Sequence, residues 1–347
     1  DRIEYGITAY LNEGTYEINE TCNIYSSDSQ PSVFIGKSME NTFIKHNVEK
    51  RFTFMVKSKS NAVFQNLTFD NVHIENKATL SFDNVIFKDG AGFQKQYSAY
   101  MNSEDEDYNN SFGGAILSAD PADVITTLNI NSCIFSNITA AYGGAISTRN
   151  ANVNIRNTTF RKTSSQIFGG AIACENSNLT LKNCTFNDSK SLDDAGGAIY
   201  LKHSNSTITN TNFNDCRAIF GGAICNLNSD CFIKNSKFEN ITAKYEGGAI
   251  NQNFANLTIL DSSFENTVAL TGGTAFADNT TLTLSNVHIK NSTALTGRSL
   301  LLLASELIGN NTVFEDNSSK ESNIYILTDI NTISRSEERR VGKECRS

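Results

Sequence analysis

The sequence predicts an all-β protein, a right-handed parallel β-helix (solenoid) with about a dozen coils of roughly 25 residues each. Three features support this fold class: a recurring glycine pair, an apolar anchor at a constant distance behind it, and strict alternation of apolar and polar residues before the anchor. The composition is typical of strands joined by polar turns, with 22 Phe, only 2 Pro and no Trp. The right hand is expected because parallel crossover connections strongly prefer it.

The tetrapeptide GGAI recurs six times, which indicates architecture rather than an active site. Related pairs follow at Gly272 and at Gly297, where Arg298 replaces the second glycine. In coils stacked about 4.8 Å apart, a tight corner favours a residue without Cβ, and the Ile behind it can point into the core. The six copies begin at Gly113, Gly143, Gly169, Gly196, Gly221 and Gly247.

An apolar anchor follows each glycine pair from Gly143 onward, always 17 residues later. The stretch from each anchor to the next pair instead varies between 8 and 10 residues. A constant segment beside a variable one predicts a strand held in register and a tolerant surface loop, where function is expected. The anchors are Phe160, Phe186, Phe213, Phe238, Phe264, Ile289 and Phe314.

The residues before each anchor predict a half-buried strand that ends in an amide corner. Apolar residues stand five and seven positions before most anchors, for example Ile155 and Val153 before Phe160. Three positions before the anchor an Asn is usual, as at Asn157 and Asn183. Because an amide both donates and accepts hydrogen bonds, we expect these residues to form an Asn ladder along the coils.

One domain is expected over residues 1–334, with 1–59 as the N-terminal cap and first coils and 60–325 as the repeat coils. Within it, 88–127 forms a coil that carries two insertions. Residues 335–347 break the Asn/Ser/Thr pattern and resemble a translated sequencing adapter, so we treat them as an artefact. Because the chain opens at Asp1 without Met, we expect a fragment of a longer protein.

The charge balance excludes some partners. A formal charge of -8 and a pI near 5.1 argue against nucleic acid, and acidic polysaccharide is a poor first guess. No apolar run approaches the roughly 20 residues of a membrane span. The oligomeric state cannot be derived from the sequence.

The repeats resemble a known family. GGAI with the downstream FSN at Phe135, FND at Phe186 and FEN at Phe238 resembles the passengers of polymorphic membrane protein autotransporters and the adhesin-like β-helix proteins of methanogenic archaea. The YLNEGTY opening at Tyr10 is similar to first coils of the pectate-lyase-like superfamily. This resemblance implies a secreted or cell-surface protein that binds glycans or surface proteins of a host or neighbouring cell, without catalysis.

The alternative is a polysaccharide lyase or glycoside hydrolase of the same superfamily. Such enzymes need clustered carboxylates, often with Ca²⁺, and a basic residue on the same face. Asp193 and Asp194 with His203 are the candidate catalytic residues. Acidic residues are common in turns, however, and no Asn-Thr-Asp, Gly-His-Gly or Arg-Ile-Lys motif of these enzymes accompanies them. The turn interpretation is therefore favoured.

The insertion coil carries the candidate metal ligands. Glu104, Asp105, Glu106 and Asp107 stand in one insertion, and Asp120 and Asp123 in the other. Ca²⁺ is the cofactor that such oxygen ligands would take, but a charge run is more often solvated, and otherwise no cofactor is expected.

Aromatic residues are the candidate ligand contacts. Tyr108 lies in the first insertion, and an aromatic residue precedes several glycine pairs: Phe112, Tyr142, Phe168 and Phe220. Stacked at one corner, these rings either pack against the coil or form a surface for sugar or protein. Packing is favoured beside GGAI. The cysteines are expected to be buried free thiols, since Cys133 and Cys184 lie two coils apart, about 9.6 Å and too far for a disulfide.

Overall fold

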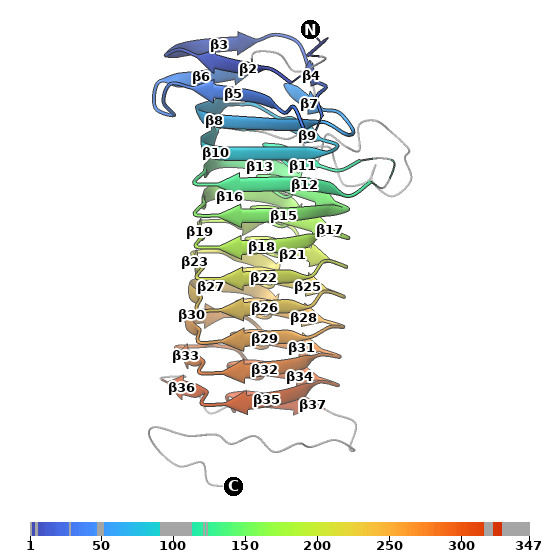
Figure 1. Ribbon diagram of the computed structural model, residues 1–347. Helices are drawn as coiled ribbons and strands as arrows, with labels where there is room; N and C mark the ends of the chain where they lie inside the picture. The colour runs from blue at the N-terminus through green and yellow to red at the C-terminus, as the bar shows by residue number, and fades with distance from the viewer. Residues whose placement is uncertain are drawn as a thin grey trace.

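The computed structural model describes residues 2–3, 6–27, 29–46, 52–90, 113–120, 122, 124–315 and 322–327. These residues form a right-handed parallel β-helix without a helical element, as predicted (Figure 1). Glu104, Asp105, Glu106, Asp107 and Tyr108 lie outside the described residues, as do Phe112, Asp123 and the tail from 335 to 347. Among the described residues, no helix has the length and apolar character that a membrane span requires.

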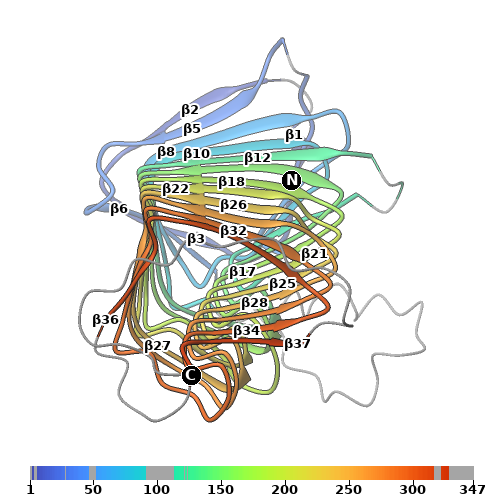
Figure 2. The same cartoon turned by 90° about the horizontal axis from the view of Figure 1, so that it is seen from below.

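Each repeat coil passes in turn through sheet A, a flat face, an anchor face and an arm. Seen along the rod axis, the flat face forms one long side of the cross-section, and sheet A lies on another (Figure 2). Sheet A has 13 strands, all in parallel register. They are β1 (Arg2–Ile3), β4 (Cys22–Ile24), β7 (Phe54–Val56), β9 (Ile74–Asn76), β11 (Ile116–Ser118), β14 (Ile146–Arg149), β17 (Ile172–Glu175), β21 (Ile199–Lys202), β25 (Ile224–Leu227), β28 (Ile250–Asn253), β31 (Ala275–Asp278), β34 (Leu300–Leu303) and β37 (Ile324–Leu327).

The flat face stacks the alternating strands that were predicted before each anchor. Its strands are β2 (Thr8–Leu11), β5 (Ser32–Gly36), β8 (Asn61–Asp70), β10 (Thr79–Lys88), β12 (Thr126–Asn131), β15 (Ala151–Arg156), β18 (Asn178–Lys182), β22 (Ser206–Thr209), β26 (Cys231–Lys234), β29 (Leu257–Leu260), β32 (Thr281–Ser285) and β35 (Glu306–Asn310). β8 and β10 continue past a bend into the anchor face. Val153 and Ile155, two of the inward members, are at most 1% exposed, so this strand prediction is confirmed.

The anchor face carries the phenylalanine column, and the arm follows it. Anchor strands are β3 (Gly14–Ile18), β6 (Thr42–His46), β13 (Ile134–Tyr142), β16 (Thr159–Phe168), β19 (Thr185–Asn187), β23 (Asn212–Asn214), β27 (Lys237–Glu246), β30 (Ser263–Val268), β33 (His288–Lys290) and β36 (Val313–Glu315). The arm is the segment that follows the anchor residue and leads to the next glycine pair. It consists of the later parts of β13, β16, β27 and β30, together with β20 (Lys190–Ser191) and β24 (Arg217–Phe220).

The arm corrects one expectation. We predicted a surface loop for this variable stretch, but the arms pair with one another in parallel, for instance Ile138 with Thr163 and Ser164 with Lys190. Backbone hydrogen bonds between arms in successive coils satisfy groups that a free loop would leave to solvent. The length variation is absorbed by bulges, such as the register shift between Ala140 and Tyr142.

The glycine pair behaves as predicted. Gly143 has a φ of +55°, in the left-handed region that glycine enters without steric cost. A Cβ added to Gly144 would lie 2.1 Å from the carbonyl oxygen of Gly170 in the next coil. The Ile residues behind the pairs, such as Ile146 and Ile172, are 0% exposed. The first glycine therefore makes the corner and the second allows two coils to approach.

Asn residues occupy most of the other corners, because they tolerate the left-handed conformation better than most residues. Asn157 and Asn183 have φ of 50° and 55°. Asn183 Nδ2 donates to Asn157 Oδ1 at 3.1 Å, and Asn210 Nδ2 donates to Asn183 Oδ1 at 3.1 Å. A second set after the anchors repeats this contact, with Asn266 Nδ2 donating to Asn240 Oδ1 at 3.0 Å. These hydrogen bonds link corners in successive coils.

The cysteines of the described chain are free thiols, and all except Cys22 are buried. Burial raises the pKa of Cys133, Cys174 and Cys216 to about 12. Thiols with such pKa values stay protonated at neutral pH and are poor nucleophiles. They serve as small apolar residues of the core.

Candidate functional site

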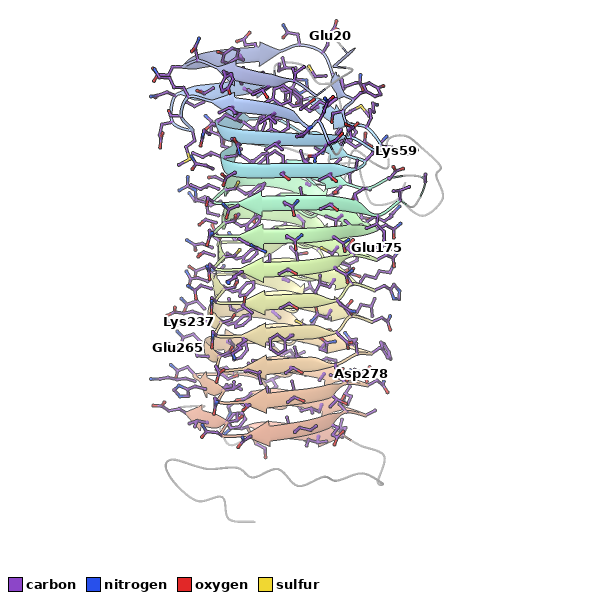
Figure 3. All side chains as sticks on the ribbon, in the orientation of Figure 1. Glu20, Lys59, Glu175, Lys237, Glu265 and Asp278 are labelled. Carbon is purple, nitrogen blue, oxygen red and sulfur yellow. The ribbon has the colours of Figure 1, made fainter. Side chains whose placement is uncertain are left out.

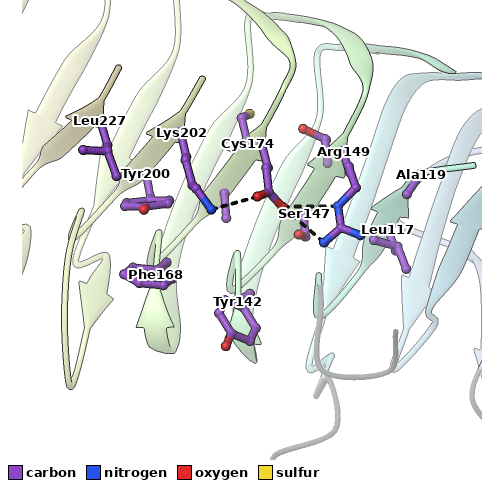
Figure 4. A pocket seen from close by; sticks show the side chains of 13 residues that line it. Leu117, Ala119, Tyr142, Ser147, Arg149, Phe168, Cys174, Tyr200, Lys202 and Leu227 are labelled. Carbon is purple, nitrogen blue, oxygen red and sulfur yellow. Dashed lines mark hydrogen bonds and ion pairs between the residues drawn. The ribbon is translucent and has the colours of Figure 1, made fainter. Parts of the chain in front are cut away.

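A groove lies between the arm and the outer surface of sheet A in the coils of β11 to β25 (Figure 4). It encloses about 320 Å³. Its walls combine aromatic rings from both sides with charged side chains from sheet A. The lining residues are Leu117, Ala119, Tyr142, Ser147, Thr148, Arg149, Phe168, Ala173, Cys174, Glu175, Tyr200, Lys202 and Leu227.

Three half-buried aromatic rings form one wall of the groove. Tyr142 and Phe168 project from neighbouring arms, with ring centroids 5.8 Å apart. Tyr200 comes from sheet A and stacks on Phe168 at 4.3 Å, with an interplanar angle of 18°. Tyr142 and Phe168 therefore line the groove and also pack against an aromatic neighbour. Phe220, the third of these candidates in the described chain, is not among the lining residues and packs against Tyr245 at 5.8 Å.

In the coil of Tyr200, the arm position that holds an aromatic ring in the neighbouring coils is occupied by Ala195. Along the arm column, Tyr142 pairs with Phe168, Phe168 with Ala195, and Ala195 with Phe220. Ala195 is the small member of this column, and in its coil the large ring, Tyr200, comes from sheet A and stacks on Phe168. Large and small residues thus alternate between arm and sheet, and the shape of the groove depends on this exchange.

An ion triad crosses three coils at the edge of sheet A. The Arg149 guanidinium lies 3.1 Å from Glu175 Oε2, and Lys202 Nζ lies 3.0 Å from Glu175 Oε1. Burial would raise the pKa of Glu175, but the hydrogen bond from Lys202 and the charge of Arg149 outweigh it, and the pKa is lowered. The carboxylate is therefore ionised at neutral pH, and it fixes both cations beside the aromatic wall (Figure 4).

The candidate catalytic residues are not brought together. Asp193 is exposed and accepts a hydrogen bond from Gln166, as a turn residue would. Burial, and then the charge of Asp193, raise the pKa of Asp194. His203 is exposed at a corner with φ of 51°, at the far end of β21 from Asp194. The four residues of β21 span about 13 Å at 3.3 Å per residue, which separates the acid from the imidazole.

A second group of charges lies near the start of sheet A. Glu75 is 4% exposed and forms an ion pair with Lys77 at 3.3 Å. Burial raises the pKa of Glu75, and burial with the neighbouring Lys77 lowers that of Lys57. Asp120, the one described member of the candidate metal ligands, accepts hydrogen bonds from Ser58 Oγ at 2.7 Å and from the Ala122 amide at 2.9 Å. Within the described chain, no three His, Cys, Asp or Glu side chains are placed to hold a metal ion.

The groove has the composition of a ligand site. Ligand sites typically combine an apolar wall with a few placed polar groups, as here. Among the described residues that line it, Glu175 alone carries a carboxylate, whereas glycoside hydrolysis uses two carboxyl groups about 5 to 9.5 Å apart. Glu175 also has a lowered pKa, which is the wrong direction for a general acid.

Sequence reasoning missed Tyr200 and the ion triad. A signal was present, because Arg149, Glu175 and Lys202 stand three residues behind the Ile of successive GGAI motifs. Charged residues at that position lie in one column, where opposite charges meet. The contribution of Tyr200 had no such signal, since its partner Phe168 belongs to a different column.

The fold defines the chain as a repeat protein of the parallel β-helix class. A model described as the Chlamydia polymorphic membrane protein repeat matches residues 132–149, which include FSN at Phe135 and GGAI at Gly143. No curated protein matches the chain.

Similar solved structures are enzymes with low sequence identity. The catalytic unit of a thermostable GH87 α-1,3-glucanase from Streptomyces thermodiastaticus has a TM-score of 0.48 and 10% identity, covering 94% of this chain and 65% of that one. The mannuronan C-5 epimerase AlgE4 A-module of Azotobacter vinelandii has a TM-score of 0.35 and 9% identity, covering 93% and 91%. The chain thus spans less than two thirds of the length of the glucanase catalytic unit.

Proposed function

We propose that this chain is a surface-displayed or secreted, adhesin-like rod that binds glycans or surface proteins without catalysis. The observation that carries the proposal is the groove, which joins three aromatic rings to an ion triad. The match to a polymorphic membrane protein repeat supports display at a surface. A stiff rod holds such sites at fixed spacing, so weak contacts add up through effective concentration.

Glycans suit this groove because a pyranose ring presents an apolar face with hydroxyl groups at its rim. The apolar face packs on an aromatic ring such as Tyr142 or Phe168. The rim hydroxyls then find charged hydrogen-bonding partners in Arg149, Glu175 and Lys202, which are already held by one another. Little side-chain freedom remains to be lost on binding, which favours affinity.

The test is binding of the chain to a glycan and extracellular-matrix protein array, with product release from the same polysaccharides measured in parallel. We expect binding without new reducing or unsaturated ends. Tyr142→Ala and Phe168→Ala should each weaken binding about tenfold or more, since each removes a stacking surface. Tyr10→Ala is the matched control, because Tyr10 is 78% exposed on β2, outside the groove.

Two results would contradict the proposal. Product release would favour the alternative, a polysaccharide lyase or glycoside hydrolase. Binding that survives both groove variants, with folding intact, would place the contact surface elsewhere on the rod.

A further inference from the structure

A shallow depression of about 400 Å³ lies on the flat face and shares no lining residue with the groove. Its lining comes from the stretch of β18, β22, β26 and β29, four successive coils. Four strands at about 4.8 Å spacing make it some 14 Å long parallel to the rod axis. The labelled charged side chains Lys237, Glu265 and Asp278 lie to the sides of this face (Figure 3).

One edge of the depression is a column of oriented polar side chains. Asn205 Oδ1 accepts a hydrogen bond from the Asp230 amide at 3.1 Å, and Asp230 Oδ1 accepts one from the Asn256 amide at 2.8 Å. With these oxygens bound to backbone, the Asn205 amino group and Asp230 Oδ2 remain for a ligand. The column therefore presents donors and acceptors already fixed in direction, one coil apart.

The centre of the depression holds an aromatic residue in a threonine column. Thr180 pairs with Thr207, Thr207 with Phe232, and Phe232 with Thr258, all on the outward side of the sheet. The Phe232 ring is half-buried, and threonines stand at the same outward position in the coils before and after it. The register shows that Thr fits this position in the neighbouring coils, so the ring is not required by the stacking of strands.

From these features we propose a second binding site on the flat face, for a neutral, linear polysaccharide in an extended conformation that runs parallel to the rod axis. One sugar ring stacks on Phe232, and the neighbouring sugar units form hydrogen bonds with Asn205, Asp230 and the threonine hydroxyls. The direction follows from the long axis of the depression. A neutral polymer is favoured because Asp230 and the formal charge of -8 repel polyanions.

The position on the sheet excludes one other occupant. A peptide strand binds by adding to an exposed sheet edge. The strands at the depression lie in the middle of the stack, where parallel neighbours pair with both sides of β22 and β26. A ligand here is therefore recognised by side chains and not by a backbone ladder.

The test is calorimetric titration of the full chain with three hexasaccharides, of β-1,4-linked glucose, mannose and N-acetylglucosamine. We expect at least one to bind, and Phe232→Thr to weaken that binding about tenfold by removing the stacking surface. Ile308→Thr is the matched control, because Ile308 stands in the same outward column, is 47% exposed, and lies beyond the depression. Asp230→Asn keeps the shape and should weaken binding less than Phe232→Thr.

The outcomes separate this site from the groove. Loss of binding in Phe232→Thr but not in Ile308→Thr or Tyr142→Ala supports the proposal, even if the array detects nothing at the groove. No binding by any hexasaccharide, or binding that Phe232→Thr leaves unchanged, overturns it. The circular dichroism spectrum and urea midpoint of Phe232→Thr should match those of the unsubstituted chain, since both neighbours carry Thr.

Discussion

Two sets of aromatic side chains run along the rod, and they differ in packing. On the anchor face, the rings from Phe135 to Phe264 lie 4.6 to 4.9 Å apart, with interplanar angles of at most 13°. These side chains are at most 1% exposed. On the arm and facing sheet A, Tyr142, Phe168 and Tyr200 are half-buried, with centroids 4.3 to 5.8 Å apart and angles of 18° to 39°.

The difference separates a structural set from a set available to ligands. A core ring meets the same environment in every coil, so a constant distance of 17 residues from the glycine pair preserves it. An arm ring meets whatever the opposite sheet provides. In the coils of Thr271 and Thr296 the arm residue is small, and the large apolar side chain belongs to sheet A. These side chains are Phe276 and Leu301, which are each 5% exposed.

The largest effect is expected in the core set. Phe186→Ala removes a ring that stacks on Phe160 at 4.7 Å and on Phe213 at 4.9 Å. It should lower the free energy of unfolding by about 3 to 5 kcal/mol, because a cavity remains where neighbouring coils cannot collapse. Urea denaturation followed by circular dichroism measures it. A loss no larger than that of Phe168→Ala would abolish the distinction between the two sets.

An intermediate effect is expected when a large and a small side chain are exchanged between the arm and sheet A. Ala195→Phe should destabilise by about 1 to 3 kcal/mol, because Tyr200 already occupies the space beside Phe168. Adding Tyr200→Ala should recover most of that loss and restore the arrangement of the neighbouring coils. A double-mutant cycle of unfolding free energies measures the coupling. Additive effects would show that arm and sheet do not share this space.

The smallest effect is expected at the ion triad. A lowered folded pKa means that Glu175 stabilises the fold above its unfolded pKa near 4.3, and that this contribution is lost as the pH falls through the folded value. Since the three side chains are 33% to 40% exposed, the contribution should stay below about 1 kcal/mol. Glu175→Gln should remove it at pH 7 and match the unsubstituted chain at pH 2, with Glu265→Gln as a surface control. An equal difference at both pH values would contradict the assignment.

Much of the fold could be predicted because each coil repeats the same constraints. The anchors, the Ile behind GGAI and the alternating strand residues occupy core positions, and each has a fixed distance from the glycine pair. Parallel hydrogen bonding then stacks equal positions on one another. The arm was less predictable, since its pairing passes through bulges that have no sequence period.

The candidate site was predicted only in part. Tyr142 and Phe168 could be picked out because they directly precede glycine pairs, yet packing was favoured for them, and the structure shows both packing and an open cavity. Asp194 and His203 stand close in the sequence, but a strand lies between them. Their separation follows from extended geometry, which only a correct strand boundary reveals.

By itself the sequence determined the class of fold, the register of the coils, the core columns and the corners, because these depend on contacts between equal positions of successive repeats. Only the tertiary structure decided that the arm faces sheet A, that Tyr200 stacks on Phe168 of the arm, and that Asn205, Asp230 and Phe232 border one depression. Those contacts join different columns across the rod. No repeated spacing records them, because they depend on the volumes of particular side chains.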